Sequence, residues 1–546
     1  MDICYYSAFV NEPLVCNESS MFEDVQLQPT RNLAINFNQT FEHRPIRLLE
    51  VREKQEAELA QIYQALATAK CRDIVNLERL ETLGDSYLKL IASMYIFFKF
   101  PSLNEGESTV LKGRLISNRN LFYLSRDKGL GSLVKVSDFS PTAEWLPPGY
   151  CVPSEITKLV LDKQLPITAL FNFCPNRDEQ LSGQLSDETF KMLEPHKCNV
   201  DDDLDKSSFS SFCNFLAKQS IRDKTIADVT EALIGVYFSS CGFDGALNFI
   251  EWLGLIPKTE EIAKLFKQPP LNPIVNPNAT EANLDILLTR YTQKSVEDII
   301  GYKFNNRAFL LQALTHGSYS ANRITLSYER LEFIGDAVLD FLITTYIYEN
   351  CENLDPGKLT DLRSALVNNE TFAAFAVRLN LHKHLKYYSS VLNNHIQKFV
   401  KYQEAKGNVV NDDVLILLNE TDLKLVQHVD VPKVLGDIFE SMVGAVYLDS
   451  GMDLNAVWKV VYKIMWKEIS QFCANIPKSP IRILMETLAP LYPTFHSAVS
   501  VGGEMVMVKL DFMLRGSLTR VHGFGQNKKG AKKAAAKIAL RLLTPK

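Results

Sequence analysis

The chain has 546 residues, more than one compact core usually holds, and this length favours three or four domains. Apolar residues make up 46% and charged residues 23%, as in an ordinary globular protein. The most apolar stretch, residues 90–100, is too short for a membrane span, and the first residues lack the basic start and long apolar run of a secretion signal. The ten cysteines include no CxxC pair, so we expect reduced thiols in a cytoplasmic, or alternatively nuclear, protein.

Charge is distributed unevenly along the chain. Residues 478–546 hold 12 Lys and Arg against 3 Asp and Glu, a net charge of +9 in a chain whose total is −5. A basic module on an acidic body suggests a polyanion-binding end joined to a part that uses carboxylates.

After an N-terminal connector (residues 1–45), the chain contains a long repeat. LERLETLGDSYL at 77–88 matches YERLEFIGDAVL at 328–339, and the offset of 251 persists for a further thirty residues. A second match pairs 226–242 with 435–451 at an offset of 209, so the first copy holds 42 extra residues. We interpret these as a surface insertion at about 130–215, and the Pro-rich stretch 268–278 as the joint between two copies of one domain.

Both copies have apolar residues at spacings of three and four, which predicts helices. On these helices, carboxylates three or four positions apart share a face. The carboxylates are Glu81, Asp85, Asp228 and Glu231 in the first copy, and Glu332, Asp336, Asp437 and Glu440 in the second. Gly84 and Gly335 lie beside the first pair of each copy, where a missing side chain permits close approach of another helix or a ligand.

Four converging carboxylates repel one another unless a cation lies between them. Oxygen ligation at this density suits Mg2+ or Mn2+, which can activate water for cleavage of a phosphodiester. The alternative is a set of solvated helix carboxylates paired with Lys or Arg, which is common for any single pair. The recurrence of both pairs in both copies, among apolar residues, favours a metal site.

The last seventy residues follow a different pattern. A helix is predicted from Pro480, strands from the alternating runs 505–514 and 518–525, and a final helix over 527–543. Lys528, Lys529 and Lys532 lie at the start of that helix, where side-chain charge and helix dipole both attract phosphates. A solvated lysine-rich face is the simpler alternative.

The motif ERLExxGDxxL followed by DxxEAxxG resembles the signature of ribonuclease III, and QALTHGSY at 312–319 resembles the helix that precedes it in that family. Residues 430–451 resemble the second ribonuclease III domain of the Dicer family, and the basic end resembles a double-stranded-RNA-binding domain. This resemblance implies a mainly α fold. Two all-helical ribonuclease III domains would pair within the chain as a pseudo-dimer, followed by a small α+β (αβββα) domain. The implied ranges are 46–258 and 294–472 for the ribonuclease III domains, 259–293 for a linker and 478–546 for the RNA-binding domain.

The same resemblance implies roles for individual residues. The eight carboxylates would bind Mg2+, with Mn2+ as a substitute, and catalyse hydrolysis. Glu78 and Glu329, which open the motif, would bind metal or else hold the domain interface. Lys224 and Lys433 would face the scissile phosphate, and a local salt bridge to the following Asp is the equal alternative. Glu486, with Lys528, Lys529 and Lys532, would bind RNA by its A-form shape.

Two segments depart from the family pattern. The first copy has Thr82 inside the motif, and its upstream segment QALATAKCRDIVN lacks the THxSY element. Its four carboxylates are all present, so we still expect a working site there. In the RNA-binding domain, VGGEM at 501–505 lacks the GPxH-like loop, so we expect weak RNA binding by this domain alone.

The resemblance as a whole implies an endoribonuclease of RNA interference and small-RNA processing. Each domain would cut one strand of duplex RNA, leaving 5′ phosphates and short 3′ overhangs. Expected partners are double-stranded RNA, a double-stranded-RNA-binding helper protein and a downstream Argonaute, with no membrane. The chain contains neither the GxxxxGK[ST] motif of a helicase nor a PAZ region, so we expect it to be part of a longer protein or an incomplete gene product.

Two rival functions remain. A non-catalytic RNA-binding scaffold would be favoured by the loss of carboxylates from either copy, and none is lost. A helical metal phosphohydrolase acting on nucleotides would not need the basic end, and it would usually draw on histidine ligands.

Overall fold

A computed structural model describes most of the chain beyond residue 40. The described residues are 41–51, 56–138, 221–256, 262–266, 268–351, 354–405, 407, 431–478, 480–500, 506–525 and 528–543. Most of the N-terminal connector, most of the insertion at about 130–215 and the turn at 501–505 lie outside this part, as does the side chain of Lys529.

The first repeat copy folds as helices. Its elements are η1 (Arg47–Leu49), α1 (Leu59–Leu66), η2 (Ala69–Cys71), α2 (Glu78–Lys99), α3 (Glu105–Leu115), α4 (Asn118–Asp127), η3 (Leu130–Leu133), α9 (Asp223–Leu253) and α10 (Ile262–Leu265). Local sequence sets several helix starts. At α3, for example, the Asn104 side chain accepts from the Glu107 N–H while the Glu107 carboxylate accepts from the Asn104 N–H. Helix α9 is long and apolar enough to cross a membrane, but 72% of its apolar window is buried inside the protein, as in a core helix.

The second copy repeats this arrangement. Its elements are α11 (Glu281–Leu287), α12 (Arg290–Ile300), α13 (Arg307–Ala313), α14 (Glu329–Asn350), α15 (Pro356–Leu366), α16 (Asn369–Arg378), η7 (Leu381–Lys383), α17 (Ser390–Ala405), α20 (Lys433–Asp449) and α21 (Leu454–Ala474). Gly242 inside α9 and Gly451 after α20 occupy matching positions and have φ of 73° and 74°. The chain therefore bends at the same place in both copies.

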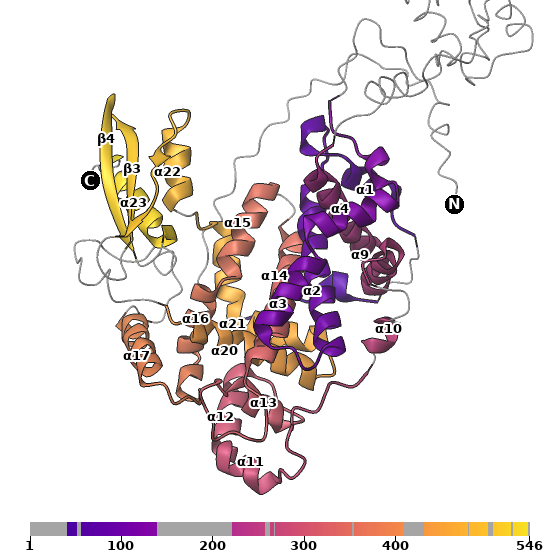
Figure 1. Cartoon of the computed structure of the whole chain (residues 1–546), viewed down its shortest axis with the longest axis vertical. Coiled ribbons are helices and arrows are strands. Elements are labelled where there is room, and N and C mark those ends of the chain that lie inside the picture. Colours follow the sequence, from indigo (N-terminus) through magenta and orange to yellow (C-terminus); the bar gives the residue numbers. More distant parts are fainter. Residues whose placement is uncertain are drawn as a thin grey trace, which may run out of the picture. The chain divides into compact units, whose positions relative to one another are not determined.

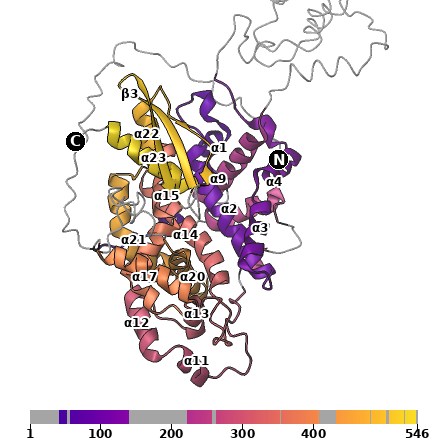
Figure 2. The same ribbon diagram turned by 60° about the vertical axis from the view of Figure 1, so that its left-hand side comes forward.

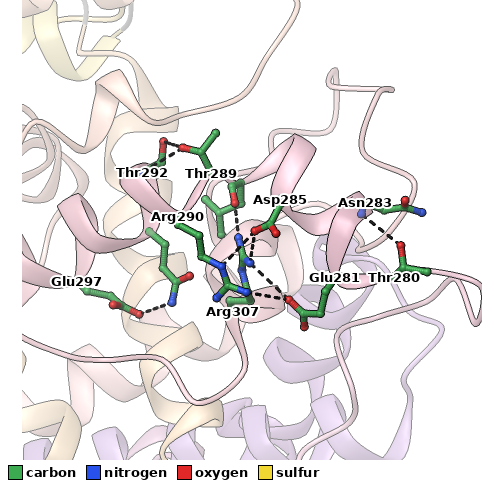
Figure 3. Close-up of polar contacts among 11 residues, drawn as sticks. Thr280, Glu281, Asn283, Asp285, Thr289, Arg290, Thr292, Glu297 and Arg307 are labelled. Carbon is green, nitrogen blue, oxygen red and sulfur yellow. Dashed lines mark hydrogen bonds and ion pairs between the residues drawn. The ribbon is translucent and has the colours of Figure 1, made fainter.

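The segment predicted as a linker is partly helical, because α10, α11 and the start of α12 lie within it. Arg307 fixes α11 to α13: its side chain is 6% exposed and donates to Asp285 and to the Leu288 carbonyl. Arg290 also pairs with Asp285, so the two arginines and this carboxylate form the polar cluster of Figure 3.

The two copies pair through their signature helices, and α2 lies beside α14 at the centre of the helical body in both views (Figures 1 and 2). Two arginines of the repeated ERLE motif hold this pair. Arg79 donates to the carbonyls of Tyr348, Cys351 and Leu354, all at 2.8–3.2 Å.

Arg330, at the matching position, donates to the carbonyls of Phe97, Phe100 and Leu103, all at 2.9–3.3 Å. These three carbonyls match the three that Arg79 contacts, residue for residue. The contacts are thus reciprocal, and they define the intramolecular pseudo-dimer expected from the duplication.

A single hydrophobic core joins the two copies. It runs from Ile46 to Phe472, and its aromatic rings meet across the pseudo-dimer, where Tyr87 and Phe238 of the first copy contact Phe341 of the second. Burial of this shared apolar surface is the main term that holds the two domains together.

The C-terminal part is a small α+β domain with a core of its own. It comprises α22 (Pro480–Leu488), β1 (Thr494–Phe495), β2 (Val499–Ser500), β3 (Val506–Leu514), β4 (Ser517–Gly525) and α23 (Lys528–Leu543). β1 and β2 pair antiparallel with successive parts of β3, and β4 pairs antiparallel along the whole of β3. The short β1 and β2 together take the place of one strand, so the predicted αβββα order is confirmed.

Candidate active sites

Each candidate site lies where two helices cross at glycines. A Cβ on Gly84 would lie 1.7 Å from the Glu231 carbonyl oxygen, and one on Gly335 would lie 1.9 Å from that of Glu440. Gly444 is equally crowded, since a Cβ there would lie 2.2 Å from the Leu331 carbonyl oxygen. The backbones of α2 and α9, and of α14 and α20, are therefore in direct contact. This confirms the close approach expected at Gly84 and Gly335, and it shows that the approaching group is a helix.

The crossings bring the carboxylates of the paired helices together. In each copy, one oxygen from each of three carboxylates lies within 4.8 Å of the other two. The triads are Glu81, Asp228 and Glu231 in the first copy and Glu332, Asp437 and Glu440 in the second. We call them the first and second triad. Glu231 is 8% exposed, and the three members of the second triad are 4–7% exposed.

Burial and nearby carboxylates favour the protonated form of the glutamates in these triads when no metal is bound. Burial, together with the charges of Asp85, Glu81 and Asp228, raises the pKa of Glu231 to about 8. Burial and nearby carboxylates likewise raise the pKa of Glu81 to about 7 and that of Glu332 to about 7. The same causes raise the pKa of Glu440 well above its ordinary value. Such a cluster is favourable only when a proton or a cation compensates its charge.

The fourth predicted carboxylate of each copy lies outside its triad. Asp85 is held by Lys89 at 2.6 Å and by Arg363 at 3.3 Å, and Asp336 pairs with Lys112 at 3.6 Å. Both remain close enough that their charge raises the pKa of the buried glutamate, Glu231 in the first copy and Glu440 in the second. The structure therefore brings three of four predicted ligands into contact and places the fourth at the edge of each cluster.

The two predicted lysines lie at the mouths of the triads. Lys224 pairs with both oxygens of Asp228, at 2.8 and 2.9 Å, which is the local salt bridge. Lys433 spans both helices, with Nζ 2.7 Å from Glu332 and 3.1 Å from Asp437. Their side chains are 66% and 65% exposed, so both ammonium groups also face solvent.

One hydrogen bond to the triad of the second copy has no counterpart in the first. The Tyr328 hydroxyl donates to Asp437 at 3.2 Å, and the matching residue of the first copy is Leu77, which has no donor. The first copy lacks the THxSY element but keeps a backbone contact there. Ala67 forms an isolated parallel β-bridge with Lys135, as Thr315 does with Lys386 in the second copy. Glu78 and Glu329 begin α2 and α14, and neither belongs to a triad.

In the RNA-binding domain, Glu486 is exposed and is held by Lys478 at 2.7 Å and Arg482 at 3.1 Å. Lys528 is exposed at the start of α23, and Lys532 lies over the Phe495 ring with Nζ 5.4 Å from its centroid. The described lysines thus lie at the helix terminus where the sequence places them.

Reasoning from sequence missed four functional cations: Arg79, Arg330, Lys112 and Arg363. All of them occupy matching positions in the repeat, and that shared offset is the signal that could have marked them. The offset alone could not show that each one contacts the opposite copy.

Known proteins match the chain along most of its length. The ribonuclease III domain family matches residues 78–242 and 329–451, and the Dicer double-stranded-RNA-binding domain family matches residues 457–546. The chain is 39% identical over 522 residues to endoribonuclease Dcr-1 of Drosophila melanogaster and 34% identical over 584 residues to endoribonuclease Dicer of Danio rerio. Each alignment covers 88% of this chain, but only 23% and 31% of the two relatives.

Among solved structures, the nuclease domain of ribonuclease III from Campylobacter jejuni is 26% identical, with a TM-score of 0.23; the match covers 32% of this chain and 96% of that one. The chain belongs to the ribonuclease III family. Within that family its two ribonuclease III domains and its Dicer-type RNA-binding domain group it with the Dicers, which confirms the resemblance seen in the sequence. It spans about a quarter to a third of the length of these relatives.

Proposed function

We propose that this chain is a divalent-metal-dependent endoribonuclease that cuts both strands of duplex RNA, one strand at each triad. The observation that carries the proposal is the pair of carboxylate triads, repeated at matching positions on either side of one pseudo-dimer. The relatives named above are endoribonucleases, which supports the same conclusion.

The residues fit a hard cation. Three carboxylate oxygens within 4.8 Å, two of them in each triad from glutamates whose pKa is raised by burial, form the oxygen-rich donor set that Mg2+ and Mn2+ prefer. Glu81, Asp228 and Glu231, with Asp85 beside them, would hold metal in the first domain. Glu332, Asp437 and Glu440, with Asp336 beside them, would do so in the second. A bound divalent cation supplies an activated water and stabilises the leaving oxygen.

The chain's own residues orient the reaction. Lys224 and Lys433 keep an exposed ammonium group at the mouth of each triad, where a cation stabilises charge on the scissile phosphate. Lys528, Lys529 and Lys532 bind the backbone of the duplex at the α23 terminus, and Glu486 meets ribose hydroxyls once its salt bridges exchange. We propose that the products carry 5′ phosphates and short 3′ overhangs and that the activity belongs to small-RNA processing. It would take place in the cytoplasm or nucleus, with a helper RNA-binding protein and an Argonaute as partners.

Strand-resolved cleavage tests this function. A long duplex labelled separately on each strand is incubated with Mg2+, Mn2+ or EDTA and with wild type, Glu231→Gln, Glu440→Gln or the double variant. Each single variant should leave one strand intact, and the double variant and EDTA should leave both intact. Glu251→Gln, in the same helix as Glu231 but outside the triad, is the matched control and should cut both strands.

The outcome also separates the rival functions. Tight duplex binding with no cleavage in Mg2+ or Mn2+ would replace this proposal with a non-catalytic scaffold. Hydrolysis of free nucleotides without cleavage of the duplex would favour a nucleotide phosphohydrolase.

A further inference from the structure

In each site the aspartate beside the triad, Asp85 or Asp336, contacts a cation from the other domain. We call these two residues the edge aspartates. Lys112 lies in α3 of the first domain, and its Nζ is 3.6 Å from Asp336 Oδ2 of the second. Arg363 lies in α15 of the second domain, and its Nη1 is 3.3 Å from Asp85 Oδ2 of the first. Lys112 and Arg363 occupy matching positions of the repeat, so the same crossing contact is formed twice.

The Lys112 side chain packs against the second domain. It is 15% exposed, its Nζ lies 4.9 Å from the centroid of the Phe333 ring, and Phe333 follows Glu332 of the second triad. A largely buried ammonium group requires a compensating charge. Asp336 supplies that charge, and in return the ammonium group fixes the position of the Asp336 carboxylate.

The Arg363 guanidinium group binds two carboxylates at once. Its Nε donates to Asp340 Oδ1 at 2.7 Å and its Nη2 to Asp340 Oδ2, which leaves Nη1 for Asp85. Asp340 and Lys89 are matching residues of opposite charge, each four positions after the edge aspartate of its own copy. Asp85 therefore has Lys89 as a second cation at 2.6 Å, whereas the matching neighbour of Asp336 is a carboxylate.

We propose that Lys112 and Arg363 are positioning residues that act on the opposite site: each holds the edge aspartate of the other domain next to its metal-binding triad. The inference rests on the proposed function, because it assigns the edge aspartates a part in metal binding there. Its consequence is that neither ribonuclease III domain is complete alone. The second site depends on Lys112 more than the first depends on Arg363, because Lys89 forms an ion pair with Asp85 at 2.6 Å but acts on Asp336 only as a nearby charge.

Lys112→Met tests this in the full chain, since it keeps the length of the side chain and removes the charge. The strand cut by the second domain is identified as the one spared by Glu440→Gln. Loss of a group that orients a metal ligand typically costs about 10- to 100-fold in metal affinity or activity. We therefore expect cleavage of that strand to fall by about 10-fold or more, with cleavage of the other strand retained and with recovery in Lys112→Arg.

Lys128→Met is the matched control. Lys128 is also in the first domain and also lies over an aromatic ring, with Nζ 4.7 Å from the Trp252 centroid, but it approaches neither edge aspartate. Its loss should change neither strand. Lys112→Gln replaces Lys112→Met if the methionine variant does not fold, as judged by circular dichroism.

Mn2+ binding gives a readout that does not depend on cleavage. In a Glu231→Gln background, which disables the first triad, titration with Mn2+ reports the second site, and adding Lys112→Met should weaken its affinity by about 10-fold. Unchanged Mn2+ affinity, or equal loss of both cuts, would overturn the inference and leave Lys112 a purely structural contact. If wild type cuts neither strand, the proposed function fails, and the Mn2+ titration still decides the positioning role.

Discussion

Replacing Gly335 by alanine tests whether the helix crossing builds the second site. The added methyl group would lie 1.9 Å from the Glu440 carbonyl oxygen and 2.9 Å from the Gly444 nitrogen, both of them backbone atoms. Real Cβ atoms essentially never come within 3.0 Å of such neighbours, so α14 and α20 must separate by about 1 Å.

The separation has two costs. Overpacking of a core by one methyl group costs about 1–3 kcal/mol, which the better helix propensity of alanine offsets by at most about 1 kcal/mol. The site loses more, because α14 carries Glu332 and Asp336 while α20 carries Asp437 and Glu440. A displacement of about 1 Å between such groups lowers a catalysed rate by roughly 100-fold.

Urea unfolding followed by circular dichroism and the strand-resolved cleavage assay measure both effects. Gly335→Ala should lower the urea midpoint and abolish most cleavage of the strand cut by the second domain. Gly113→Ala is the control, since a Cβ there meets nothing within 4 Å, and it should be neutral or stabilising. An unchanged midpoint together with wild-type cleavage of both strands would refute the claim that backbone contact sets the geometry of the site.

Three further predictions concern charge. The pKa of Glu231 is raised to about 8, so the folded protein binds a proton at this carboxyl group more tightly than the unfolded chain does. The melting temperature in EDTA should therefore fall as pH rises from about 5.5 to about 8, and Mg2+ should restore it. A melting temperature in EDTA that does not change with pH would contradict the assigned burial of Glu231. Arg330→Lys keeps the charge but cannot reach three carbonyls with one planar group, and it should lower the free energy of unfolding by about 1–3 kcal/mol, seen as a lower urea midpoint. An unchanged midpoint would remove Arg330 from the interface. Lys532→Ala should weaken duplex RNA binding in a filter-binding titration. It should also reduce by about 1 the slope of the logarithm of the binding constant against the logarithm of the salt concentration. Binding equal to that of wild type at all salt concentrations would exclude a phosphate contact at Lys532.

Much of the fold follows from patterns that the chain repeats. The spacing of Glu81 and Asp85, or of Asp437 and Glu440, places carboxylates on one helix face, and an unbroken offset shows that both copies fold alike. The glycines beside them predict close approach, and the structure confirms it. Spacing and repetition thus lead to eight candidate carboxylates, six of which lie in the triads, while the class of protein follows from the resemblance of the motifs to ribonuclease III.

Other features depend on information that a linear pattern does not contain. The repeat shows that Lys112 and Arg363 are equivalent, but the partner of each is fixed by the packing of α2 on α14, which is a tertiary property. The edge position of Asp85 follows from competition among Lys89, Arg363 and the triad, and no spacing rule ranks three such partners. For the same reason the sequence left the role of Lys224 open.

The reciprocal arginine contacts also bear on how the two halves can change over time. In a dimer of identical chains a substitution appears on both sides of the axis at once, so a change tolerated at one site must be tolerated at the other. Joining both copies in one polypeptide removes that constraint while Arg79 and Arg330 preserve the pairing. The opposite charges of Lys89 and Asp340 are of this kind: a lysine that suits position 89 would, if also placed at 340, put a positive charge where Arg363 now binds a carboxylate. Covalent duplication therefore lets the two halves of one symmetric scaffold change independently of each other.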